Sequence, residues 1–148
     1  MVGLPASGKT TVARSLASEL PAVRFSLDEW MLRLHGLRFD EPSYVERLPG
    51  CRALILDTAS EVLAAGVDVV LDWNHWSPER RQEAASWAAA NAAELMVHHL
   101  TTGVSKAKQR ALARQDERSH VLATDHIEHA VSYLVPPDVH EGHRITLH

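Results

Sequence analysis

The chain has 148 residues, enough for one domain with a proper core and too few for two ordinary domains. Its 45% hydrophobic and 23% charged residues are typical of a soluble globular protein, and a net charge of −4 indicates no general attraction to nucleic acid. The one cysteine, Cys51, excludes an internal disulfide. We therefore expect a single domain over residues 1–148, in the cytoplasm, without a signal peptide or a membrane span.

The first motif lies at the start of the chain, where residues 3–10 fit the pattern G-x-x-x-x-G-K-[ST], the phosphate-binding loop called Walker A. Gly3 and Gly8 let the backbone curl so that successive N–H groups point at phosphate oxygens. Lys9 would bring its charge to the β- and γ-phosphates of ATP, and Thr10 would offer its hydroxyl to Mg²⁺. The predicted phosphate-binding residues are Gly3, Leu4, Pro5, Ala6, Ser7, Gly8, Lys9, Thr10 and Thr11.

The strand that should lead into this loop is short in the sequence. Only Met1 and Val2 precede Gly3, whereas a buried strand has about five or six residues. We expect a truncated first strand, either because the natural reading frame begins upstream or because the sheet contains a short central strand.

The loop is followed by a helix and then a strand. Val12, Leu16 and Leu20 recur at helical spacing, and Pro21 stops the pattern. Residues 22–25 are predicted to form a strand, so Asp28 follows its carboxyl end, where ligands bind in open α/β sheets. Asp28 is either a general base for a substrate hydroxyl or the N-cap of a helix that starts at Glu29, and its spacing alone does not separate these.

The next segment, residues 29–49, predicts only a turn or two of helix, because Gly36, Pro42 and Pro49 interrupt it. An amphipathic helix is predicted from Cys51 to Gly66. The apolar run 67–71 is typical of a buried parallel strand.

Asp72 closes this apolar run. An acidic residue at that position is typical of a Walker B carboxylate, which holds Mg²⁺ directly or through water. The alternative is an acidic residue that opens a polar loop. We favour the metal interpretation because of the phosphate loop. His75 follows closely and is a candidate for substrate binding.

The rest of the chain continues the alternation. Ser77 and Pro78 predict the N-cap and first turn of a helix. Residues 95–100 predict a strand, residues 105–115 a long helix, residues 127–134 a shorter helix and residues 144–147 an edge strand. Strands alternating with helices predict an α/β three-layer sandwich with a parallel sheet.

Two further patterns in the sequence also have simpler interpretations. Arg110, Arg114 and Arg118 recur every four residues and could clamp a transferred phosphoryl group, although a solvated basic face explains the pattern alone more readily. The histidine pairs 126/129 and 140/143 have helical spacing but lack the HExxH pattern of zinc sites, so a zinc site is a minor alternative.

Taken together, the sequence GLPASGKTT, Asp28 after the second strand, the strand ending in Asp72, and Arg110 with Arg114 resemble small P-loop kinases of the AAA-type ATP-binding family. Zeta toxins, chloramphenicol phosphotransferases and polynucleotide kinases are related to that family. The resemblance covers nearly the whole chain. It implies a P-loop NTPase fold, Asp28 as general base, and Arg110 and Arg114 as lid arginines on the ATP phosphates.

The expected function is therefore transfer of the γ-phosphate of Mg·ATP to a hydroxyl. The acceptor, a small molecule or a nucleic-acid end, is not indicated by the resemblance. The alternative is an ATP-binding switch or ATPase without a phosphoacceptor, for which no base at Asp28 is needed. Lys9, Asp28, Arg110 and Arg114 are the predicted catalytic residues, and Thr10 and Asp72 the predicted metal ligands.

Overall fold

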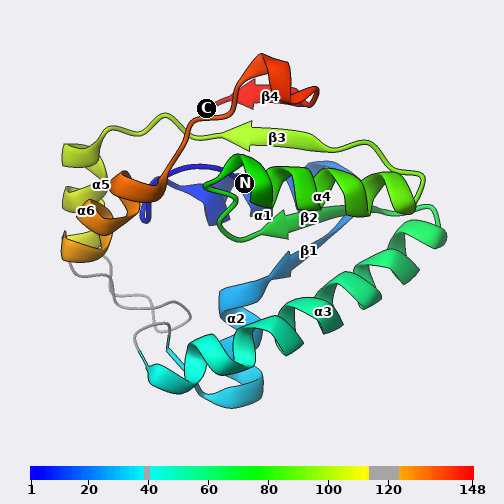
Figure 1. Cartoon of the computed structure of the whole chain (residues 1–148), viewed down its shortest axis with the longest axis horizontal. Coiled ribbons are helices and arrows are strands. Elements are labelled where there is room, and N and C mark those ends of the chain that lie inside the picture. Colours follow the sequence, from blue (N-terminus) through cyan, green and yellow to red (C-terminus); the bar gives the residue numbers. More distant parts are fainter. Residues whose placement is uncertain (39–40, 114–123) are drawn as a thin grey trace. The chain divides into compact units, whose positions relative to one another are not determined.

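The computed structural model describes residues 1–38, 41–113 and 124–148 (Figure 1). These residues form two compact units, which are described separately. One unit contains residues 1–12, 74–113 and 124–148, and the other contains residues 13–38 and 41–73. The chain passes from the first unit to the second within helix α1 (Lys9–Glu19).

The second unit is built around two parallel strands that pair from Ala22 opposite Asp68 to Ser26 opposite Asp72. Helix α3 packs against both strands and against α2 (Figure 1). The elements of this unit after α1 are β1 (Ala22–Ser26), α2 (Leu27–His35), α3 (Pro42–Ala64) and β2 (Asp68–Asp72). This parallel pairing brings the carboxyl ends of β1 and β2 to the same edge, as the sequence predicts.

Helix α3 corrects the expectation for residues 29–49, because it begins at Pro42 and continues through Pro49. Pro42 is compatible with a helix start, where its missing N–H would have no intrahelical partner. Pro49 removes one hydrogen bond from the helix interior. Burial of Tyr44, Cys51, Ile55 and Ala59 on one side of the helix outweighs that loss.

The first unit also contains parallel strands, which pair from Met96 opposite Arg144 to His99 opposite Leu147. Val2, just before the phosphate loop, adds a single parallel bridge to His99. The Val2 amide donates to the His98 carbonyl at 2.8 Å, and the Leu100 amide donates to the Val2 carbonyl at 2.9 Å. The elements of this unit after α1 are α4 (Pro78–Ala90), β3 (Met96–His99), α5 (Val104–Leu112), α6 (Thr124–Tyr133), the 3₁₀ turn η1 (Val139–Glu141) and β4 (Arg144–Leu147).

The core of this unit joins the phosphate loop to two helices. Helices α5 and α6 pack together, and Leu4 of the loop is buried between alanines of these helices and Ile127. Alanines at the contact let the backbones approach closely. The buried cluster consists of Leu4, Ala107, Ala111, Ile127 and Ala130, with Ala6, Trp76 and Leu134 packed against it.

Both units alternate parallel strands with helices, so the predicted α/β class is confirmed. The predicted strands near residues 22–25, 67–71, 95–100 and 144–147 all form. None of the helices that the structure describes combines the length and apolar character needed to cross a bilayer.

Candidate functional site

The backbone of the phosphate loop adopts the curled conformation that its sequence predicts. Gly3 and Gly8 have φ values of 146° and 106°, and Ala6 is left-handed at 58°. A Cβ on Gly3 would lie 2.8 Å from Ser7 Oγ and 3.0 Å from the Leu100 carbonyl oxygen. A side chain at Gly3 would be strained at this φ and would clash with Ser7 Oγ, so the loop favours glycine there.

Polar groups of the loop converge on its interior. The Lys9 ammonium donates to the carbonyls of Gly3 at 3.0 Å and Leu4 at 2.7 Å. Ser7 is 3% exposed, and its Oγ has no hydrogen-bond partner among the residues that the structure describes. Thr10 and Thr11 are the second and third residues of α1, at the positive end of the helix dipole. A cation, a buried hydroxyl and a helix N-terminus together fit a phosphate group.

Arg110 of α5 lies against the same loop. Its Nη1 donates to the Ser7 carbonyl at 2.9 Å, and the Thr102 hydroxyl donates to that carbonyl at 3.0 Å. A Cβ on Gly8 would be 3.7 Å from Arg110 Nη1, so the guanidinium lies beside the predicted phosphate site. This contact argues against a merely solvated basic face. Arg114 and Arg118 lie outside the described residues.

A tryptophan also supports the loop, which the sequence does not indicate. Trp76 packs against the cluster around Leu4, and its indole Nε1 donates to the Gly3 carbonyl at 2.9 Å. The Gly3 carbonyl therefore accepts from both Lys9 and Trp76. The sequence Trp-Asn-His-Trp follows Asp72, but nothing in it indicates that Trp76 binds Gly3, which lies 73 residues away.

Asp28 is in the first turn of α2 and does not cap it. Ser26 is the N-cap, with its side chain accepting from the Glu29 amide at 3.5 Å, so the predicted cap role of Asp28 is wrong. The Tyr44 hydroxyl donates to Asp28 Oδ1 at 3.2 Å. Burial, followed by the negative charge of Asp28, raises the pKa of Tyr44 well above its usual value. Tyr44 therefore remains a hydrogen-bond donor to Asp28 throughout the physiological pH range.

Asp72 ends β2 and pairs with an arginine of the neighbouring strand. Its Oδ2 accepts from Arg24 Nε at 2.8 Å and lies 2.8 Å from Arg24 Nη2, and its side chain is 3% exposed. Arg24 also binds Glu29 at 2.8 Å. Burial acts to lower the pKa of Arg24, but hydrogen bonds and charges from Glu29 and Asp72 outweigh it and raise that pKa. The hydrogen bond from Arg24 in turn lowers the pKa of Glu29.

The predicted residues thus fall into two groups. The loop residues and Arg110 come together in one unit, whereas Asp28 and Asp72 belong to the other unit. His75 is buried, and its amide donates to the Met1 carbonyl at 3.2 Å, which places it behind the loop. Within the described ranges, no group of three or more His, Cys, Asp or Glu side chains could hold a metal.

Three solved structures share this fold. A chain of the Pnkp1/Rnl/Hen1 RNA repair complex aligns with a TM-score of 0.74 and 24% identity over 90% of this chain, which spans only 42% of that chain. Chaetomium thermophilum Kti12, in complex with ADP-AlF3, aligns with a TM-score of 0.70 and 23% identity over 99% of this chain and 86% of its own. An unliganded sugar kinase from Janibacter sp. aligns with a TM-score of 0.67 and 15% identity, over 99% and 81%.

At these identities the likeness concerns the fold, and it confirms the predicted P-loop NTPase fold. Comparison with curated proteins returned no match. The sequence profile of the AAA domain family matches residues 1–137, a span that includes the phosphate loop, Asp28 and Asp72. The chain therefore belongs to the AAA domain family and resembles its small P-loop kinases.

Proposed function

We propose that this protein is an ATP-dependent phosphotransferase that moves the γ-phosphate of Mg·ATP to a hydroxyl of a small molecule or a nucleic-acid end. The geometry of the phosphate loop carries the proposal. Its glycines hold a curl in which a side chain at Gly3 would be strained, and Lys9, Ser7 and Arg110 converge on it. Such an arrangement supplies backbone N–H donors and cations to a polyphosphate.

In this proposal the loop residues bind and orient the donor. The ammonium of Lys9 leaves the carbonyls of Gly3 and Leu4 and pairs with the β- and γ-phosphates. Arg110, held beside Gly8 through the Ser7 carbonyl, stabilises negative charge on the transferred group. The resemblance implies that Arg114, which lies outside the described residues, also contacts the ATP phosphates.

Asp28 acts as the general base. Its carboxylate accepts the proton of the acceptor hydroxyl while the acceptor oxygen bonds to the γ-phosphorus. The bond from that phosphorus to the β–γ bridging oxygen breaks, and ADP leaves. The Tyr44 hydroxyl, which donates to Asp28 Oδ1, orients the carboxylate.

Mg²⁺, when bound, neutralises charge on the β- and γ-phosphates. The Thr10 hydroxyl at the start of α1 would bind the ion, and the Asp72 carboxylate would help to hold it. Arg24 already engages Asp72 Oδ2 through two nitrogens, so we propose that Asp72 acts through an ordered water rather than directly.

The similar structures support this class of reaction without identifying the acceptor. One is named a sugar kinase, one was solved with ADP-AlF3, and one belongs to an RNA repair complex. These names motivate two acceptor classes, sugars and RNA ends.

The test is transfer from ATP labelled at the γ-phosphate, in Mg²⁺ buffer, to 5′-hydroxyl RNA, 5′-hydroxyl DNA and a panel of sugars. The proposal predicts labelled acceptor that disappears in Lys9→Ala. If labelled phosphate is released at the same rate whether or not an acceptor is present, the protein is an ATPase without a phosphoacceptor. Lys106→Ala, an exposed lysine on α5, is the matched control and should transfer like the wild type.

A further inference from the structure

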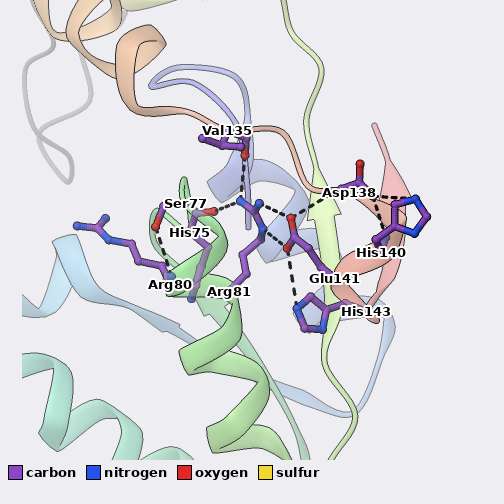
Figure 2. Close-up of polar contacts among 9 residues, drawn as sticks. All are labelled: His75, Ser77, Arg80, Arg81, Val135, Asp138, His140, Glu141 and His143. Carbon is purple, nitrogen blue, oxygen red and sulfur yellow. Dashed lines mark hydrogen bonds and ion pairs between the residues drawn. The ribbon is translucent and has the colours of Figure 1, made fainter.

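Among the described residues of the first unit, the largest fully buried side chain is a charged one. Arg81, on the first turns of α4, is 1% exposed. Its Nε and Nη2 donate to both carboxylate oxygens of Glu141 at 2.6 and 2.5 Å. Its Nη1 donates to the carbonyls of His75 at 3.1 Å and Val135 at 3.0 Å (Figure 2). A buried guanidinium requires such complete pairing, because an unpaired charge there would be very unfavourable.

One of the two carbonyls that Arg81 binds belongs to the residue before Trp76, and the other belongs to Val135, which pairs with Trp76. His75 precedes Trp76 in the sequence, and the Val135 amide donates to the Trp76 carbonyl at 2.9 Å. Arg81 Nη1 therefore bridges the backbone at His75 and at Val135 (Figure 2). These are the two segments that also meet at the Trp76 carbonyl. Glu141 fixes the guanidinium from the other side through η1, where a capping box with Asp138 orders its carboxylate.

The segment held in this way contacts Met1, just ahead of the phosphate loop, and Gly3 within the loop. The His75 amide donates to the Met1 carbonyl at 3.2 Å, and the Trp76 indole donates to the Gly3 carbonyl at 2.9 Å. Lys9 also donates to the Gly3 carbonyl, at 3.0 Å. When Lys9 turns to a phosphate, the Trp76 indole is the donor that keeps the Gly3 carbonyl paired and the loop curled.

We propose that Arg81, fixed by Glu141, is a positioning residue for nucleotide binding that acts on the phosphate loop through the Trp76 indole. This inference rests on the proposed function, because it assumes that the loop binds Mg·ATP. It assigns the segment from Asp138 to Glu141 a role in ligand affinity, although neither residue belongs to the loop. An ion pair that only stabilises the fold would leave the affinity of folded protein unchanged.

The experiment measures Mg·ATP affinity by calorimetry, at a temperature where every variant is folded. Arg81→Met, Glu141→Gln and Trp76→Phe should each weaken binding by at least about tenfold. Arg80→Met is the matched control, because Arg80 is the neighbouring exposed arginine and its Nη1 donates to the Asn74 carbonyl at 3.4 Å. Its affinity should stay at the wild-type value. Glu141→Gln and Trp76→Phe keep the test valid if Arg81→Met does not fold.

Two further readouts separate positioning from general destabilisation. The double variant Arg81→Met/Trp76→Phe should bind Mg·ATP within about twofold of the weaker single variant. Both changes interrupt the same series of contacts, from Arg81 through Trp76 to the phosphate loop. The indole N–H resonance that vanishes in Trp76→Phe should shift in Arg81→Met and stay in place in Arg80→Met. Wild-type affinity in folded Arg81→Met and Glu141→Gln, or additive losses in the double variant, would overturn the inference alone. Absence of Mg·ATP binding to the wild type would overturn the proposed function and this inference together.

Discussion

Lys9 illustrates how the loop holds charge. Its ammonium lies on the carbonyls of Gly3 and Leu4, so a phosphate must compete with two hydrogen bonds of 3.0 and 2.7 Å. The doubly charged terminal phosphate is the stronger acceptor, because charge-assisted hydrogen bonds are about twice as strong as those to neutral groups. The same ammonium can therefore order the loop without ligand and bind phosphate with it.

Asp28→Asn is predicted to lower phosphoryl transfer by about 10²-fold or more, the usual effect of losing a general base. ATP affinity should stay within about threefold, because the base acts on the acceptor and its loss leaves the donor site unchanged. Steady-state transfer and a separate ATP titration measure the two effects. Asp57→Asn, an exposed aspartate on α3, is the control. Full transfer by Asp28→Asn would leave Asp28 without a catalytic role.

At the level of elements, Arg24 joins strands β1 and β2 to the start of α2. Arg24→Ala should destabilise the protein by about 3 kcal/mol, because it removes a cation that pairs with the buried Asp72 carboxylate. Arg14→Ala removes only the partly exposed pair with Glu29 and should cost less than about 1 kcal/mol. Urea denaturation measures both variants. Equal, small losses would show that Asp72 does not depend on Arg24.

The link between α4 and η1 predicts a dependence on pH. The hydrogen bonds from Arg81, together with its charge, lower the pKa of Glu141, and His143 lies 4.0 Å from the same carboxylate. A carboxyl group whose pKa falls on folding stabilises the fold at pH values above its unfolded-state pKa of about 4.3. That stabilisation is lost as the pH falls through the folded-state pKa. The melting temperature of Glu141→Gln should therefore lie below that of the wild type at pH 7, with the gap narrowing below about pH 4.

The control is Glu128→Gln, which removes an exposed pair with Lys108. Its melting temperature should follow the wild type closely at every pH. A constant gap between wild type and Glu141→Gln down to pH 3 would contradict the assignment of this stabilisation to the Arg81–Glu141 pair.

Local patterns predicted most of the elements and the loop. The apolar spacing of residues 12–20, the Ser77–Pro78 start of α4 and the apolar run before Asp72 each specify their structure within a few neighbouring residues. Helix α3 was predicted too short, because Pro49 is a local signal for a break and burial of Tyr44 is a tertiary effect. The pairs Arg81–Glu141 and Arg24–Asp72 join residues 60 and 48 positions apart, and no local pattern encodes such partners.

For the whole molecule, the single domain expected from the sequence remains a prediction. The family profile spans residues 1–137 and so includes parts of both compact units. We predict one cooperative thermal transition, in which the calorimetric enthalpy equals the van't Hoff enthalpy. Two separate transitions in scanning calorimetry would mean that the units unfold independently and that the chain holds two domains.

The central claim is that residues 3–11 bind Mg·ATP, and calorimetric titration of the wild type beside Lys9→Ala tests it most directly. The account predicts saturable one-to-one binding to the wild type and a loss of at least about tenfold in affinity for Lys9→Ala, the effect of removing a charge-assisted contact to phosphate. Lys106→Ala, exposed on α5, should bind like the wild type. Undiminished affinity in Lys9→Ala, or no binding to the wild type, would contradict the claim.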